Sequence, residues 1–210
     1  MATSAGQQNI PQSVPVSPNT GADAQTNQQK ARAILDKMIE ALGGAAYMNL
    51  HDAYTEGRYG RFHNEVMVGG TVFFRYWQWP DKERIELTKQ RDVVDLYIGG
   101  RVTEVTFRGP RELNPKTDDN LRQAIQRRHY TLEVVLREWL KDPATLLLYE
   151  GPTLAQNRMA ERVTLVNPRN ESVSILVSQD THLPVEKIFV TRDPQTHDGT
   201  VKTNRGKNRL

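Results

Sequence analysis

The chain has 210 residues, of which 37% are hydrophobic and 7% aromatic, a composition that allows one globular domain with a lean core. Its formal net charge is +3, and it has no cysteine, which excludes disulfides, thiolate metal sites and a cysteine nucleophile. No stretch approaches the roughly 18 apolar residues that a membrane-spanning helix needs.

The basic residues are concentrated at the end of the chain. From Arg192 onward there are five Lys or Arg against two Asp, which leaves 23 basic and 23 acidic residues in the rest of the sequence. A nucleic-acid groove needs a basic stripe on the folded surface. The neutral body of the chain therefore predicts no nucleic-acid partner.

The first part of the chain is polar and is followed by a helical pattern. Residues 1–27 are predicted to be a disordered leader, which also lacks the charged start and apolar run of a secretory signal. Next, TNQQKARAILDKMIEALGG predicts an amphipathic helix with Thr26 as a possible N-cap and Gly43 as its end. The apolar side chains that recur at three and four residues are Ala31, Ile34, Leu35, Met38, Ile39 and Leu42.

After this helix the apolar period becomes two. DAYTEGRYGRFHNEVMV predicts two strands around Gly60, and GGTVFFRYWQWPDK predicts a strong strand over residues 71–79. Residues 84–88 alternate charged and aliphatic side chains, so we expect Ile85 and Leu87 to face the core.

The next two strands form the best-defined hairpin of the sequence, DVVDLYIGGRVTEVTF, in which Gly99 and Gly100 predict a two-residue turn. This turn sets three pairs of residues opposite one another: Ile98 and Arg101, Leu96 and Thr103, and Val94 and Val105. One face of the hairpin is therefore apolar, while Asp95 and Glu104 belong to the other.

A helical insert interrupts the strands. Residues 118–128 start with acids and end with arginines, as the helix dipole favours, and a second helix over residues 132–140 is stopped near Pro143. Four further strands are then predicted, over residues 145–149, 161–166, 171–178 and 185–191. The last residues, 193–210, show no periodicity and predict a disordered basic tail.

Consecutive hairpins without alternating helices indicate an α+β protein. We predict a curved antiparallel sheet that forms an incomplete β-barrel, with an N-terminal helix and inserted lid helices against one face. The domain would cover residues 28–192, between the leader and the tail.

The most enzyme-like stretch is SQDTHLPVEK, which contains Asp180 and His182. A catalytic pair would need a nucleophile or an orienting acid nearby, and no G-x-S-x-G motif occurs. The hairpin turn is therefore the favoured interpretation. The remaining histidines lack metal-binding spacing, and the glycine pairs lack a nucleotide-binding pattern. The sequence predicts no catalytic residue, no metal and no cofactor.

The aromatic strand allows two interpretations. Phe73, Trp77 and Trp79 are expected on one face, whereas Phe74 and Tyr76 are expected on the other. The strand could lie between two layers of core, or it could form a concave apolar surface that accepts an acyl chain under the helix carrying Trp139. The residues themselves favour neither.

Five segments together resemble the outer-membrane lipoprotein-sorting or carrier-like family, and in particular a soil-bacterial branch of it: ILDKMIEALGG, LHDAYTEGR, WPDKERIELTKQRDVVDLYIGGR, RRHYTLEVVLREWLKDPATLLLYEG and VSQDTHLPVEKIFVTRDPQT. The resemblance covers about residues 31–196. It implies an unclosed barrel with a helical lid, whose apolar interior shelters the acyl chains of lipoproteins in the periplasm, and it implies no cofactor and no catalytic residue. The ligand-binding residues would be Phe74, Tyr76, Trp77, Val94, Leu96, Val135 and Trp139.

The sequence departs from that family at both ends. The relatives are exported, whereas no signal is visible here, and they continue with further strands where this chain has a short basic tail. Our leading hypothesis is a non-enzymatic periplasmic carrier of lipid or lipoprotein acyl chains. The alternative is an envelope interaction module that binds a protein partner through its sheet surface or edge. An enzyme comes third, and a polar pocket around Asp180, His182 or another histidine would indicate one.

Overall fold

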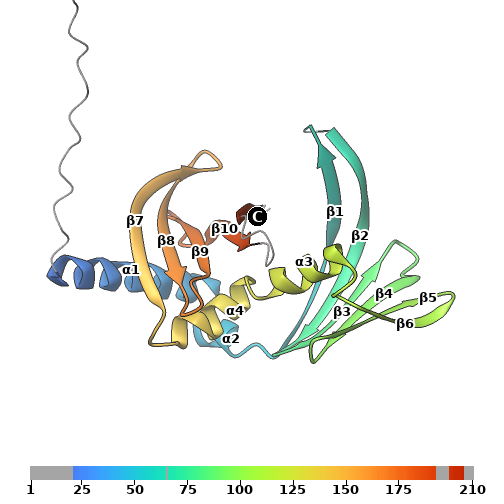
Figure 1. Cartoon of the computed structure of the whole chain (residues 1–210). Helices are drawn as coiled ribbons and strands as arrows, with labels where there is room; N and C mark the ends of the chain where they lie inside the picture. The colour runs from blue at the N-terminus through green and yellow to red at the C-terminus, as the bar shows by residue number, and fades with distance from the viewer. Residues whose placement is uncertain (1–20, 65, 193–198, 206–210) are drawn as a thin grey trace, which may run out of the picture.

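The computed structural model describes residues 21–64, 66–192 and 199–205. Two antiparallel sheets stand apart, and helices lie between and beside them (Figure 1). The helices are α1 (Gly21–Leu42), α2 (Gly44–Met48), α3 (Asp119–Arg128), α4 (Leu132–Arg137) and the short 3₁₀ helix η1 (Trp139–Lys141).

The first sheet has six strands, each paired with the next along the chain. They are β1 (Asp52–His63), β2 (Val66–Gln78), β3 (Lys82–Leu87), β4 (Val93–Ile98), β5 (Arg101–Thr106) and β6 (Gly109–Leu113). The second sheet has five strands in the order β11-β10-β9-β8-β7. These are β7 (Leu146–Ala155), β8 (Arg158–Val166), β9 (Ser172–Ser178), β10 (Pro184–Arg192) and β11 (Gly199–Arg205).

The α+β class and the antiparallel, unclosed sheet are confirmed. The strands divide into two sheets, however, instead of forming one curved sheet. The division falls at the helical insert, because α3 and α4 separate β6 from β7 in the chain and no ladder joins those two strands.

Helix α1 begins earlier than predicted. It starts at Gly21, so residues 21–27 of the predicted leader are helical and Thr26 lies inside the helix instead of capping it. The end is as predicted, because Gly43 follows Leu42 with a φ of 119°, a conformation that glycine adopts without strain. The other leader residues lie outside the described part of the chain.

The prediction of two strands around Gly60 is wrong. Gly60 lies within β1, opposite Gly70 of β2, and the chain reverses after His63, where Asn64 has a φ of 47°. Glycine suggested a turn, but the two strands approach closely here: a Cβ on Gly70 would lie 2.4 Å from the carbonyl oxygen of Tyr59 and 3.2 Å from the Cα of Gly60.

The hairpin at Gly99 and Gly100 is confirmed in register. Val94 pairs with Val105, Leu96 with Thr103 and Ile98 with Arg101. Both glycines have positive φ, as the two-residue turn requires.

The predicted tail contains a strand. Gly199–Arg205 form β11, which pairs with β10 from Arg192 opposite Gly199 to Glu186 opposite Arg205. Residues 193–198 and 206–210 of the predicted tail lie outside the described part of the chain.

The helical insert follows its sequence signals. Asp118 caps α3 by accepting a hydrogen bond from the backbone N–H of Leu121 at 3.0 Å, and Arg127 and Arg128 occupy the last turn. Thr131 caps α4, and η1 continues to Lys141 before the chain enters the second sheet.

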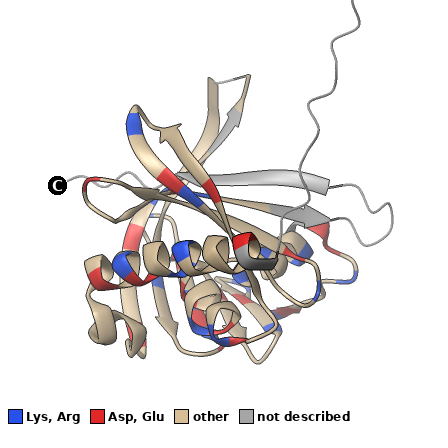
Figure 2. Ribbon diagram, turned by 90° about the vertical axis from the view of Figure 1, so that its left-hand side faces the viewer, with Lys and Arg blue, Asp and Glu red and all other residues tan. Residues whose placement is uncertain are grey.

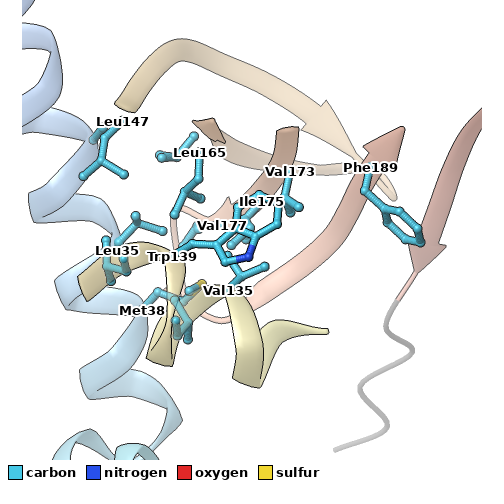
Figure 3. Packing of buried hydrophobic residues seen from close by; sticks show 14 of the residues in the cluster. Leu35, Met38, Val135, Trp139, Leu147, Leu165, Val173, Ile175, Val177 and Phe189 are labelled. Atoms are coloured by element: carbon cyan, nitrogen blue, oxygen red, sulfur yellow. The ribbon is translucent and has the colours of Figure 1, made fainter. Parts of the chain in front are cut away.

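The main core lies between α1, α4, η1 and the second sheet (Figure 3). Leu35 and Met38 of α1 pack with Val135 and Trp139 against valine, leucine and isoleucine side chains of β7, β8 and β9. Acidic and basic residues are interspersed along the described helices and strands (Figure 2). None of the described helices is both long and apolar enough to span a bilayer.

Candidate functional site

A cavity of about 670 Å³ lies between the first sheet, helices α3 and α4, and strand β10. This volume is within the range of about 300–1,000 Å³ that is typical of small-molecule sites. Its apolar lining is Ile85, Tyr97, Ala124, Leu132, Pro184, Val185 and Phe189. Its charged lining is Arg75, Glu83, Arg127, Arg128, Glu133, Glu186 and Lys187. The hollow predicted as apolar is therefore of mixed character.

Strand alternation brings charged and apolar residues to the same wall. Arg75 of β2 lies opposite Ile85 of β3, and Glu83 of β3 lies opposite Trp77 of β2 and Tyr97 of β4. Directly opposed residues project to the same side of a sheet. These five residues therefore share one face, which we call the inner face because the cavity joins it to α3.

Glu83 connects the sheet to the lid. It is only 7% exposed and forms ion pairs with both Arg75 of β2 and Arg128 of α3. The Arg128 guanidinium also lies over the Tyr97 ring, 4.3 Å from its centroid. Burial, together with the positive charge of Arg75, lowers the pKa of Arg128 to about 10. One carboxylate thus holds the end of α3 against the first sheet.

Lys187 of β10 forms the opposite wall of the cavity. Its ammonium donates a hydrogen bond to the backbone carbonyl of Tyr130, just beyond α3. The pKa of Lys187 is lowered to about 8, mainly by burial. The positive charge of Arg75 also lowers this pKa, whereas the negative charge of Glu133 raises it. The charges of β2, α4 and β10 therefore act on one another across the same hollow.

Two smaller cavities adjoin this region. One of about 60 Å³ is bordered by Trp77, Trp79 and Arg128, and another of about 280 Å³ is bordered by Tyr97, Val102 and Arg128. Arg128 lines all three cavities. Its side chain therefore lies at their common boundary.

Four of the seven residues predicted to bind ligand lie on the opposite face of the first sheet, which we call the outer face: Phe74, Tyr76, Val94 and Leu96. Tyr76 packs against Tyr54 with ring centroids 4.9 Å apart, and the Arg91 guanidinium covers the Phe74 ring at 3.8 Å. The expected shared face of Val94 and Leu96 exists, but it points away from α3.

The other three predicted residues lie elsewhere. Trp77 is on the inner face and borders the 60 Å³ cavity, while Val135 and Trp139 are buried in the main core (Figure 3). None of the seven lines the 670 Å³ cavity. The reason is that α4 packs its apolar side against α1 and the second sheet, so the side chains that reach the cavity from α4 are Leu132 and Glu133.

Asp180 and His182 belong to a turn, as predicted. The backbone N–H of His182 donates to the carbonyl of Ser178 at 3.0 Å, and the N–H of Thr181 donates to the Ser178 hydroxyl at 3.2 Å. Both residues lie between β9 and β10 and neither lines the 670 Å³ cavity. His129 borders the 280 Å³ cavity instead.

Sequence reasoning missed the charged residues of the cavity. Two signals were present. Arg75 lies two residues before Trp77 and so shares its face of the aromatic strand, and Glu83 shares a face with Ile85, which was predicted to face the core. A charge on an inward-facing position is uncommon unless it is paired or functional. No comparable signal marked Arg128 or Lys187, whose placement depends on the packing of α3 and β10.

No protein-family model and no curated protein sequence matches this chain. Several solved structures are similar to it. A DUF1329 family protein from Desulfovibrio piger shares 12% identity and a TM-score of 0.49, over 79% of this chain and 74% of the other. A LolA superfamily protein from Nitrosomonas europaea shares 13% identity and a TM-score of 0.44, over 85% and 77%.

A further similar structure is the complex of Pseudomonas aeruginosa MucA and MucB, with 14% identity and a TM-score of 0.30 over 85% of this chain and 59% of that one. At such low identities these similarities concern the fold.

Proposed function

We propose that this chain is a binding protein that holds an amphiphilic acyl ligand in the 670 Å³ cavity. The observation that supports this is the lining, which offers Ile85, Leu132 and Phe189 to an acyl chain and charged side chains to a headgroup. Ligand sites typically combine apolar walls with a few convergent polar groups. The sequence resemblance to an exported carrier family supports the periplasm as its place of action.

The cavity also explains why α3 ends in arginines. Arg128 is held between Glu83 and the Tyr97 ring, so α3 covers the inner face without filling the space beside it with apolar side chains. A lid held by an ion pair over a partly apolar hollow suits a ligand that is itself part apolar and part charged.

A series of saturated acyl ligands of increasing length tests this proposal by calorimetric titration. Each buried methylene contributes about 0.8 kcal/mol, so affinity should rise about fourfold per methylene until the cavity is full. An affinity that does not change with chain length would contradict the proposal.

A variant pair locates the binding. Ala124→Phe places a large side chain in the cavity wall and should abolish binding, whereas Gln123→Phe puts the same ring on the neighbouring exposed position of α3 and should leave it unchanged. Equal loss in both variants would show that the cavity is not the site.

A second candidate function rests on the outer face of the first sheet. Tyr54, Tyr76 and Ile98 are 49%, 37% and 52% exposed and surround a depression of about 350 Å³. Exposed aromatic and aliphatic side chains of this kind suit a protein partner. Absence of acyl binding together with an association that Tyr76→Glu abolishes would favour this function over the first.

A further inference from the structure

The charged residues of the cavity do not balance one another. Arg75, Arg128 and Lys187 face the cavity with Glu83 and Glu133, so this group carries three positive and two negative charges. The remaining charged lining residues, Arg127 and Glu186, contribute one charge of each sign. The lining as a whole therefore has an excess of one positive charge.

The excess is concentrated where the sheet meets the lid. Glu83 is the only acid that forms ion pairs with Arg75 and Arg128 among the described residues, and it serves both of them. Glu133 acts on Arg75 and Asp81 acts on Arg128 at longer range, without an ion pair. The two guanidiniums therefore share one directly paired carboxylate next to the cavity. Guanidinium groups bind carboxylates and phosphates with paired hydrogen bonds.

Lys187 adds a cation whose hydrogen bond goes to a neutral group. Its ammonium donates to the carbonyl of Tyr130, and no ion pair of Lys187 occurs within the described part of the chain. Burial and the charge of Arg75 lower its pKa, whereas the charge of Glu133 raises it, so these groups lie near one another. An ammonium removed from water gains most from a negative partner.

Resting on the function proposed above, we propose that the ligand is an anionic amphiphile. Its carboxylate or phosphate headgroup lies among Arg75, Arg128 and Lys187, and its acyl chain runs along Ile85, Leu132 and Phe189. The headgroup supplies the negative charge that the cavity lacks, and the apolar lining supplies the affinity for the chain.

The test compares four probes with the same twelve-carbon chain at pH 7, each below its micelle concentration, titrated into the full chain by calorimetry. Dodecanoate and dodecyl phosphate carry the anion, monododecanoylglycerol is neutral and dodecylammonium is cationic. Acetate and inorganic phosphate serve as headgroups without a chain. We expect both anionic amphiphiles to bind at least about tenfold more tightly than the neutral probe.

Two lysine variants locate the headgroup. Lys187→Met keeps the length and apolar stem of the side chain and should remove most of the preference for the anion, while the neutral probe binds as before. Lys141→Met changes an exposed lysine of η1 that lies outside the cavity lining and should preserve the preference. Circular dichroism of both variants checks that the fold is retained.

Each other outcome has a definite meaning. Equal affinity for anionic and neutral probes, or tighter binding of dodecylammonium, would overturn the anionic ligand and leave the acyl-binding function standing. Binding of acetate or phosphate as tight as that of the amphiphiles would also overturn it, since a free anion would then suffice. If none of the probes binds, the result would contradict the proposed function itself.

Discussion

Individual charged side chains decide what the interior of this protein can accept. Glu83 is buried and Lys187 is half-buried. Glu83 pairs with two arginines, whereas Lys187 donates to a backbone carbonyl. Burial of a charge is costly unless it is paired. Lys187 is therefore retained at a cost to stability, as is typical of residues whose role is to bind.

That cost predicts a pH dependence of stability. The pKa of Lys187 is lowered to about 8 in the folded chain, whereas an unfolded lysine titrates near about 10.4. Between these values the unfolded chain binds more protons, so the free energy of unfolding should rise with pH. We expect a gain of about 1 to 2 kcal/mol between about pH 7.5 and 9.5, measured by urea unfolding.

The Lys187→Met variant serves as the control for this prediction. It has no titrating group at position 187, so its free energy of unfolding should stay nearly constant over the same range. The interval ends below about pH 10, where tyrosines of the unfolded chain begin to lose their protons. Burial raises the pKa of Tyr47, Tyr97 and Tyr130 to about 12, so these residues lower the free energy of unfolding only above that pH. A wild-type stability that falls or stays level as pH rises would contradict the assignment.

At the scale of elements, the edges of the sheets determine where the protein can associate. Strand β7 is an edge of the second sheet, and α1 runs along it. The Asn27 side chain both donates to the carbonyl and accepts from the N–H of Tyr149, each at 2.8 Å. The amide thus occupies one position of the ladder that an added strand would use.

Replacing Asn27 should expose this edge. Asn27→Ala leaves both backbone groups of Tyr149 without their partner, so we expect a loss of about 1–2 kcal/mol in unfolding free energy and increased self-association. Gln28→Ala changes the adjacent exposed residue of α1 and should do neither. Light scattering and chemical denaturation measure the two effects, and identical behaviour of the two variants would refute this role.

For the whole molecule, the contacts between the two sheets run through α4 and its buried residue Arg137. The Arg137 guanidinium donates to the carbonyls of Tyr47 and Leu50, both at 2.7 Å, in the segment that leads into β1. It also lies 4.9 Å from the Trp79 ring centroid and 5.6 Å from that of Trp77. One side chain therefore connects the core of the second sheet to the first sheet.

Arg137→Met should weaken this connection. Loss of two hydrogen bonds from a charged donor, together with the contacts to the tryptophans, is expected to cost about 2–4 kcal/mol of unfolding free energy. Because the cavity lies between the two parts, affinity for acyl probes should fall as well. Lys141→Met is the matched control, and a stable variant with unchanged ligand affinity would show that the two sheets are held together by other contacts.

Much of the fold could be predicted because its signals are local. The Gly99–Gly100 turn defined the register of β4 and β5, and Asp118 marked the start of α3. The errors also have local causes. Gly60 suggested a turn although it lies within β1 opposite Gly70, where the two backbones approach closely. Polar composition concealed residues 21–27 of α1, which tertiary contacts such as that of Asn27 stabilise.

Which residues share a face of the first sheet was determined by the sequence alone, because side chains alternate strictly along a strand. Phe74 and Tyr76 were correctly separated from Trp77 in this way. Which of these faces lines a cavity was decided only by the tertiary structure, through the packing of α3 against Tyr97 and Arg128 against Glu83. Alternation fixes relative orientation within a sheet, whereas the choice of a covered face depends on contacts between residues far apart in the chain, which no local pattern encodes.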